Sequence, residues 1–329
     1  MSSDDGITIR LLAPAEAERL VGLIRRCYGE SYIDPSFYDE PVVRERLESG
    51  ILSSIGAFSD QGALVGHMGI TLRSRGTLSA DAGMTLVDPA FRGKGIARRV
   101  AGGLAKQAIA LGLVGVHDYP VTVHTATQRI GRDFGVETGL MLANLPADVV
   151  FEQMESGASG SRTSSVIRWL PFAQSPGRSV HLPERYCEQL ESSYAACYLK
   201  RALGPSGAPG TAATELAAKY DERRQTLRLE LERIGPDLAA RVASEMQAPR
   251  ATPPLVVHAD LPLGDAAAET AVGALRELGF FFAGLLPEYR DGDILRMQWL
   301  DGSVDVASAG AIERDSTRAI EAFVLEDRP

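Results

Sequence analysis

Apolar and polar positions in the first half of the chain alternate between strand and helix periods. Leu20, Leu23, Ile24 and Cys27 form the stripe of an amphipathic helix, which we expect over residues 14–28. Polar turns separate three later apolar runs and predict antiparallel hairpins. Strands are expected at 8–12, 53–58, 63–72, 78–87, 114–123, 137–142 and 165–170, and further helices at 42–48, 95–111 and 127–134, with the Gly- and Ser-rich stretch 155–165 as an excursion. This order predicts an α/β (α+β) fold, with a mixed central sheet and helices on both faces.

The second half repeats part of this order. A low-complexity linker at 204–214 follows a helix at 183–199. Strands are then expected at 225–233, 255–259, 280–286 and 294–300, and helices at 236–246, 265–278 and 311–325. The succession strand, helix, strand, helix, strand, strand matches that of residues 78–170, which indicates a duplicated fold. We therefore predict two domains, 1–175 and 176–329.

Composition narrows the possible partners. The chain is 45% hydrophobic and 23% charged, with no apolar run long enough to span a bilayer, and its N-terminus lacks the basic and apolar regions of a signal peptide. The net charge of −9 disfavours nucleic acid as a partner. Three cysteines lack metal-ligand spacing and cannot all pair. We predict a cytoplasmic protein that binds no metal, membrane or nucleic acid.

The segment MTLVDPAFRGKGIARRV, residues 84–100, has the features of a phosphate site. An apolar strand ends at Val87, and a loop containing Gly93 and Gly95 opens a long helix. Glycine lets the backbone approach a ligand closely, and a helix N-terminus presents unpaired N–H groups and partial positive charge. Arg92, Lys94, Arg98 and Arg99 concentrate positive charge there on an otherwise acidic chain. The segment predicts binding of a phosphate-bearing ligand.

Two other phosphate motifs fit less well. A Walker A loop needs four residues between its glycines and a Ser or Thr after the lysine, and neither is present. A Rossmann fingerprint would need glycine where Arg98 stands.

The segment resembles the GNAT superfamily of acyl-CoA N-acyltransferases. The family signature Q/R-x-x-G-x-G/A matches residues 92–97, and the strand and helix order from residue 8 to residue 142 also follows the family. The resemblance implies that the backbone of 93–98 binds the coenzyme A pyrophosphate. It also implies a splayed or bulged fourth strand, whose backbone near 85–87 pairs with pantetheine and whose N–H polarises the thioester carbonyl. It implies coenzyme-binding residues Thr85, Leu86, Val87, Arg92, Gly93, Lys94, Gly95, Ile96, Ala97 and Arg98.

The chain departs from the family at the proton-transfer positions. Counting back from Gly135, Gly131 replaces the Tyr that protonates the leaving thiolate in many relatives, and His124 replaces their Asn. Aminolysis of a thioester still needs a neutral amine. The candidate catalytic residues are Asp81, which is placed like the general-base Glu of histone-acetylating members, His124 at the end of the fifth strand, and Tyr119 as an acid. A coenzyme contact is the alternative role for His124.

The second half lacks the phosphate motif. The corresponding turn reads Ile234-Gly235-Pro236-Asp237, with one glycine, no basic cluster and an acid at the helix start. We predict a degenerate GNAT-like domain that completes the acceptor cleft, covers a sheet edge or makes a dimer contact.

These observations predict an N-acyltransferase. The acyl group would pass from acyl-CoA (acetyl-CoA or a longer thioester, or an acyl carrier protein) to a small-molecule or peptide amine. A non-catalytic acyl-CoA sensor is the alternative, and a homodimer is a possible assembly.

Overall fold

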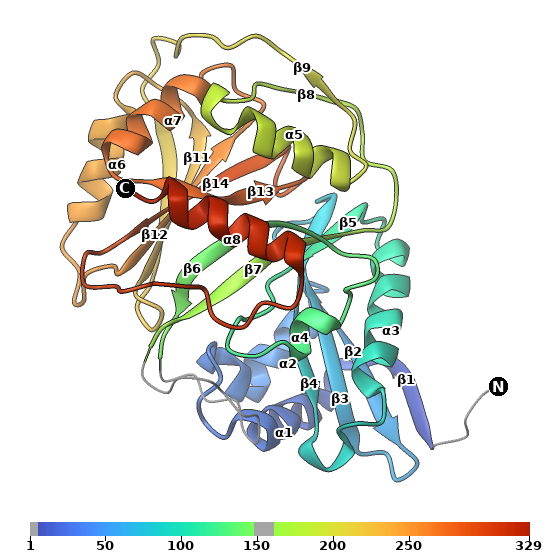
Figure 1. Cartoon of the computed structure of the whole chain (residues 1–329). Helices are drawn as coiled ribbons and strands as arrows, with labels where there is room; N and C mark the ends of the chain where they lie inside the picture. The colour runs from blue at the N-terminus through green and yellow to red at the C-terminus, as the bar shows by residue number, and fades with distance from the viewer. Residues whose placement is uncertain (1–5, 148–160) are drawn as a thin grey trace.

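The structure is a computed structural model that describes residues 6–147 and 161–329. Its main feature is one twelve-stranded mixed sheet that runs through both halves of the chain (Figure 1). The strand order is β1-β2-β3-β4-β5-β7-β6-β13-β14-β12-β11-β10. The mixed sheet and its helices confirm the predicted fold class. The sheet is continuous from the first half of the chain into the second.

The N-terminal half places helices on both faces of its strands. Helix α3 packs on one face of the sheet, and α1 and α2 pack on the other. The strands are β1 (Ile7–Leu11), β2 (Leu52–Ser59), β3 (Leu64–Thr71), β4 (Ser79–Val87), β5 (Gly115–Asp118), β6 (Val136–Leu145) and β7 (Thr163–Pro171). The helices are α1 (Ala17–Tyr28), α2 (Glu40–Glu48), α3 (Ile96–Ala110) and α4 (Ala126–Arg129), with short 3₁₀ turns at Pro14–Glu16, Pro35–Tyr38 and Pro89–Phe91.

The C-terminal half places its helices on one face only. One apolar core gathers side chains from all four helices against the same face of the strands. The strands are β10 (Glu215–Asp221), β11 (Thr226–Arg233), β12 (Val256–Pro262), β13 (Phe281–Leu286) and β14 (Ile294–Leu300), and the helices are α5 (Cys187–Ala196), α6 (Leu238–Gln247), α7 (Ala268–Glu277) and α8 (Asp315–Asp327). A separate two-stranded sheet pairs β8 (Arg178–Val180) with β9 (Arg201–Leu203). A 3₁₀ turn at Glu184–Tyr186 leads into α5 between these two strands.

The sequence of β11 explains why one face stays uncovered. Leu227, Leu229 and Leu231 are fully buried against the helices, whereas Arg228 and Glu230 alternate with them and point to the opposite face. Parallel pairing sets Arg228 beside His258 on β12, so both side chains lie on that face. This face of the C-terminal half is therefore polar.

Strand directions repeat between the two halves. In the first half β3–β4 is antiparallel, β4–β5 is parallel, and β5–β7 and β7–β6 are antiparallel. The pairs β10–β11, β11–β12, β12–β14 and β14–β13 follow the same succession. The strand order that suggested a duplicated fold is therefore present in three dimensions.

The two halves meet where β6 runs antiparallel to β13. Their one register pair joins Gly139 to Gly284, and a Cβ atom added at Gly139 would lie 2.2 Å from the carbonyl oxygen of Ala283. The Gln298 side chain fills the adjoining gap, since its amide nitrogen donates to the carbonyl oxygens of Leu140 (3.0 Å) and Phe282 (2.9 Å). Helix α8 packs across both strands (Figure 1). We call this junction the seam.

Several predicted elements have different bounds. The strand expected at 114–123 ends at Asp118, because the chain turns away from β4 around Pro120 and forms an isolated bridge from Val121 to β7. The helix expected at 127–134 is one turn, since Gly131 adopts a positive φ of 80°. Edge strand β10 was not predicted. Most of the excursion expected at 155–165 lies outside the described residues.

Candidate active site

The predicted phosphate loop forms an open turn at the start of α3. Gly93 and Gly95 have φ values of 77° and 69°, the left-handed region that favours glycine. A Cβ atom added at either glycine would have no neighbour within 4 Å, so the N-terminus of α3 faces open space. Before this turn, the Asp88 carboxylate accepts from the backbone of Ala90 (3.0 Å) and pairs with Arg26 (2.6 Å). The loop therefore has the free N–H groups and the room that an anion needs.

The basic residues around this loop divide into two groups. Lys94 and Arg98 are exposed, and the Lys94 ammonium lies 4.9 Å from the centre of the Phe91 ring. Arg99 instead donates to the backbone carbonyl of Ile7 (2.5 Å) and ties α3 to β1. Ile96 is buried beneath the turn, so its side chain anchors the helix start.

Strand β4 carries the predicted bulge. The register with β3 shifts between the pairs His67–Leu86 and Gly69–Gly83, so β4 has one extra residue there. Met84 adopts a φ of 52°, and its carbonyl accepts from Nδ1 of His67 (3.0 Å). His67 is fully buried and its Nε2 bonds with the Ser54 hydroxyl (2.9 Å). Burial lowers the pKa of His67 to about 4, so it is a neutral structural support for the bulge.

Strands β4 and β5 separate after a short paired stretch. They pair only from Ser79 to Asp81, against Gly115 to His117, and then diverge. Of the predicted pantetheine residues, Thr85 lines the resulting opening, whereas the Leu86 side chain is buried in the core and only its backbone is available. The divergence opens the cleft that the family resemblance implied.

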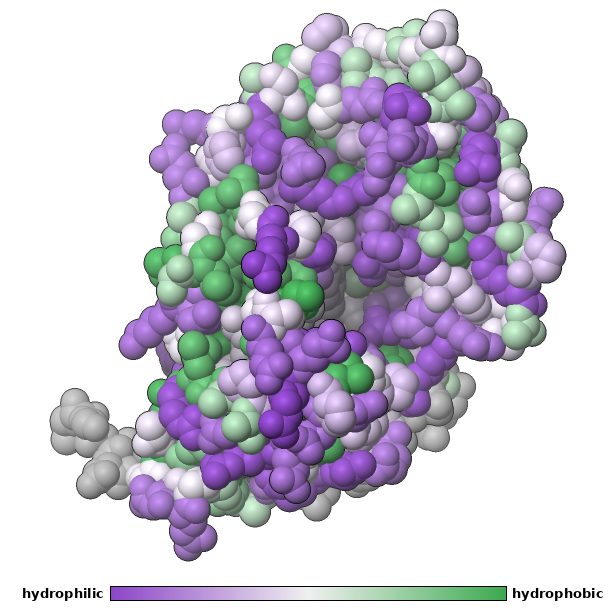
Figure 2. Space-filling view, turned by 180° about the vertical axis from the view of Figure 1, so that it is seen from behind, coloured by the Kyte–Doolittle hydropathy of each residue, from purple (hydrophilic) through white to green (hydrophobic). Residues whose placement is uncertain are grey.

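A cavity of about 560 Å³ continues this opening into the space between the two halves. The face opposite to that of Figure 1 is hollowed there, with hydrophilic residues around the hollow (Figure 2). Its walls are the β4 bulge, the segment from Tyr28 to Phe37, the chain after β5, and the uncovered face of β10, β11, β12 and β14. A hydrogen bond from Arg223, in the turn between β10 and β11, to the carbonyl of Ser31 (3.0 Å) joins the Tyr28–Phe37 segment to the wall from the C-terminal half. The C-terminal half thus forms one wall of the cleft.

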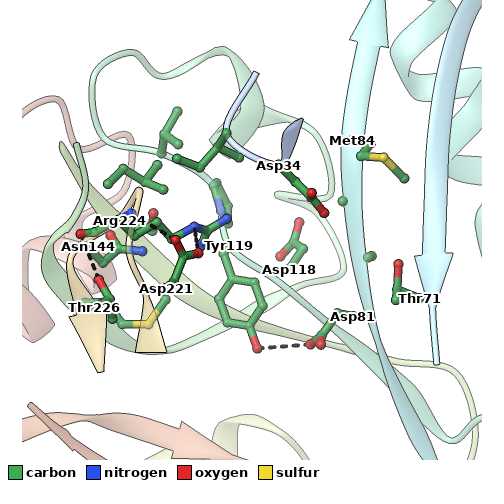
Figure 3. Close-up of a pocket in the computed structure, with 18 of the residues that line it drawn as sticks. Asp34, Thr71, Asp81, Met84, Asp118, Tyr119, Asn144, Asp221, Arg224 and Thr226 are labelled. Atoms are coloured by element: carbon green, nitrogen blue, oxygen red, sulfur yellow. Dashed lines mark hydrogen bonds and ion pairs between the residues drawn. The ribbon is translucent and has the colours of Figure 1, made fainter. Parts of the chain in front are cut away.

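Two of the three predicted catalytic residues meet in this cavity. The Tyr119 hydroxyl donates to Oδ1 of Asp81 (3.1 Å; Figure 3). The Arg73 guanidinium donates to the same oxygen (2.7 Å). Burial and the Asp81 charge raise the pKa of Tyr119 well above its usual value, so this phenol stays protonated. Neighbouring Asp118 is bound at both oxygens by Arg168 (2.8 and 2.5 Å), so its charge is already paired.

The third candidate, His124, does not line the cavity. It is 9% exposed, just before α4. Burial first, and then the nearby positive charge of Arg92, lower its pKa. Proximity to Arg92 places His124 on the side of the phosphate loop rather than beside Asp81.

The wall from the C-terminal half contains functional candidates that sequence reasoning missed. Arg224, Arg228, His258 and Arg296 all line the cavity. Figure 3 shows Arg224 with Asp221 and Thr226 on one side of the cavity, and Asp81, Asp118 and Met84 on the other. The alternation of Arg, Leu and Glu in TLRLELER, residues 226–233, was the available signal. It identifies a polar face without showing what that face borders.

This fold and site suit an acyl-CoA-dependent acyltransferase. More particularly, residues 17–125, about a third of the chain, match the model of the acetyltransferase (GNAT) family. A search of curated protein sequences found no significant match. Within the described residues, no helix is both long and apolar enough to cross a membrane.

Solved structures show a similar arrangement over about half of the chain. A chimeric spermidine N-acetyltransferase from Vibrio cholerae and hSSAT is 16% identical, covers 51% of this chain and 96% of its own, and has a TM-score of 0.40. A phosphinothricin acetyltransferase from Sinorhizobium meliloti, solved with AcCoA, is 17% identical, with coverages of 51% and 89% and a TM-score of 0.41. An Escherichia coli GNAT family N-acetyltransferase, solved with CoA, is 18% identical, with coverages of 53% and 85% and a TM-score of 0.34. At these values the similarity carries no inference about substrate.

Proposed function

We propose that the protein is an N-acyltransferase that passes an acyl group from acyl-CoA directly to a primary amine in a ternary complex. One observation carries this proposal. A single cavity joins the bulge of β4, where a thioester would lie, to the carboxylate of Asp81 and the hydroxyl of Tyr119.

The donor would bind along the outer side of this cleft. The open loop 92–97 and the N-terminus of α3 suit the pyrophosphate, and the exposed Lys94 and Arg98 add positive charge. Pantetheine would follow β4 past the bulge, where a backbone N–H can polarise the thioester carbonyl. His124, close to Arg92, is assigned here to coenzyme contact. An acyl carrier protein presents the same pantetheine arm, so the strand would serve either donor.

Asp81 is proposed as the general base. Both of its hydrogen bonds described here use Oδ1, which leaves Oδ2 for the acceptor. The amine nitrogen attacks the thioester carbon, its proton passes to Asp81, and the carbon–sulfur bond breaks. Tyr119 would then protonate the departing thiolate and recover a proton from Asp81 through their hydrogen bond. This pair would replace the tyrosine that the family places at position 131.

Release of free thiol separates an enzyme from a sensor. With acetyl-CoA and a panel of primary amines, we expect stoichiometric thiol release and a matching N-acetylated product by mass spectrometry. A sensor would bind acetyl-CoA without amine-dependent thiol release, and that outcome would contradict the proposal.

The C-terminal half is proposed to be a degenerate GNAT-like unit that shapes the acceptor side and binds no coenzyme. At the start of α6, a Cβ atom added at Gly235 would lie 2.4 Å from the backbone nitrogen of Thr214, so residues 212–214 already fill the phosphate position. Asp237 accepts from that same nitrogen (2.7 Å) and adds negative charge. In addition, β11 and β12 stay paired from Thr226 to Glu230, longer than β4 and β5 do.

We therefore expect one coenzyme A per chain. Calorimetric titration of the full-length protein with coenzyme A should give a stoichiometry of one, because the start of α3 is open whereas residues 212–214 fill the corresponding position at the start of α6. The Asp237→Asn variant should keep the same stoichiometry, since removal of the charge leaves residues 212–214 in place. A stoichiometry of two in the unaltered protein would overturn the assignment of the second half.

A further inference from the structure

The cavity wall from the C-terminal half is unevenly charged. Arg224 pairs with Asp221 (3.2 Å), Arg296 pairs with Asp260 (2.6 Å), and Lys219 pairs with Glu230 (2.8 Å). Arg228 lies on the same face, and among the described residues no carboxylate comes within ion-pair distance of it. Its described hydrogen bond is to the hydroxyl of Tyr289 (3.3 Å). Asp260, the partner of Arg296, also attracts Arg228, so two arginines share one carboxylate and one positive charge on this wall is unbalanced.

His258, next to Arg228, has unused hydrogen-bonding capacity. It is 2% exposed, it lines the cavity, and neither ring nitrogen has a hydrogen-bond partner. Burial, together with the charges of Arg296 and Arg228, lowers its pKa well below the usual value. The ring is thus neutral and offers one N–H donor and one acceptor. A buried polar side chain without partners costs stability unless a ligand satisfies it.

We propose that Arg228 and His258 bind a carboxylate of the acyl acceptor. This inference rests on the proposed function and names its substrate class. A carboxylate carries the single negative charge that Arg228 lacks, and it can accept from both the guanidinium and the imidazole N–H. A phosphate dianion would leave one negative charge unbalanced, so the charge count favours the carboxylate.

The position of the subsite relative to Asp81 defines the acceptor further. The Tyr289 ring lies 4.0 Å from the guanidinium carbon of Arg73, which holds Asp81, and the Tyr289 hydroxyl bonds to Arg228. One tyrosine side chain thus spans the interval between the proposed base and the proposed carboxylate subsite. A cavity of about 560 Å³ that also receives the acyl end of the donor suits a small molecule. The acceptor is a compact amino acid-like zwitterion, with its amine at Asp81 and its carboxylate at Arg228.

Matched acceptor pairs provide the test. L-amino acids and their carboxamides are compared as acceptors with acetyl-CoA, with kcat/KM measured from thiol release. We expect the best acid to exceed its amide by at least about tenfold, the range for a hydrogen bond to a charged group. Amides have the less basic amine and the larger neutral fraction at pH 7, so such a preference runs against intrinsic reactivity. Arg228→Gln should bring the ratio close to one, and Arg228→Lys should give an intermediate ratio.

A control and a binding measurement keep the subsite testable apart from catalysis. Arg233→Gln removes an arginine from the same strand that pairs with Glu215 and does not line the cavity, so it should keep the ratio. Binding of N-acetyl amino acids and N-acetyl amino acid amides is measured by calorimetry on the coenzyme A complex, after circular dichroism verifies that each variant folds. The unaltered protein should bind the best N-acetyl acid at least about tenfold more tightly than its amide, and Arg228→Gln should not.

The outcomes separate the two proposals. Thiol release with equal use of acids and amides would overturn the carboxylate subsite and leave the acyltransferase proposal intact. Selective binding of N-acetyl acids without thiol release from any amine would support the subsite and contradict the proposed function. Equal binding of acids and amides, or discrimination that survives in Arg228→Gln, would overturn the subsite.

Discussion

Gly95→Asp should abolish measurable binding of coenzyme A, with an affinity loss of about 100-fold or more from like-charge repulsion. The added carboxylate would stand at the first turn of α3, where the free N–H groups face open space. It would then occupy the position of the pyrophosphate, and its negative charge would repel the pyrophosphate. Calorimetric titration of the full chain with coenzyme A measures the effect.

Two control variants separate charge from backbone strain. Gly76→Asp introduces the same side chain at a φ of 76°, also with no neighbour within 4 Å of the added Cβ, but in the turn between β3 and β4. It should lose the same free energy of unfolding, roughly 1–2 kcal/mol, because a non-glycine residue is strained at a positive φ, and it should keep its coenzyme A affinity. Gly95→Ala should bind more tightly than Gly95→Asp. Unchanged affinity in a folded Gly95→Asp protein would remove the loop from the donor site.

Asp81→Asn should lower kcat by roughly 10²–10⁴-fold while coenzyme A affinity stays the same. The amide keeps the size of the side chain but cannot take a proton from the acceptor. Since a deprotonated amine no longer needs the base, the deficit should shrink as the pH rises toward the pKa of the acceptor amine. Steady-state rates between pH 6 and pH 9 test this dependence, which a purely structural role would not produce.

Companion variants define the proton path. Tyr119→Phe should reduce kcat less than Asp81→Asn does, because water can protonate a thiolate leaving group more easily than it can replace a fixed base. Asp60→Asn, at the exposed turn after β2, should leave the rate unchanged. If Asp81→Asn and Tyr119→Phe both keep nearly full turnover, another group takes the proton.

The sequence could predict the turn at residues 92–97 because its geometry is local. Two glycines with positive φ, a helix start and adjacent basic residues lie within eight positions, so no distant contact is needed to form the site. The contact between Asp81 and Tyr119 is different. It depends on how far β4 and β5 stay paired, and Pro120 alone did not reveal where the chain leaves the sheet.

The polar wall of the C-terminal half could not be predicted from sequence for a related reason. Alternation in β11 shows that Arg228 lies opposite the apolar core, but a polar face can border solvent, a helix or a cavity. The three-dimensional structure shows that all four later helices pack on the other face, so that the polar face of β11 stays uncovered by them. Strand β10 escaped prediction because its exposed alanines and charges resemble a loop, as is common for an edge strand.

The seam has a consequence for how the two halves divide their roles. From the Gly139–Gly284 pair outward, the strands β6, β7, β5, β4 and β3 on one side correspond in order and direction to β13, β14, β12, β11 and β10 on the other. An isologous two-fold interface has the same arrangement. Two identical subunits joined this way would carry the same residues on both sides of the axis, so a change that improves one binding wall would be copied into the other. A single chain that contains both halves escapes that constraint. The glycine contact can keep the same strand pairing on both sides of the seam while Gly95 on one side and Arg228 on the other change independently, each for the substrate that we propose it contacts.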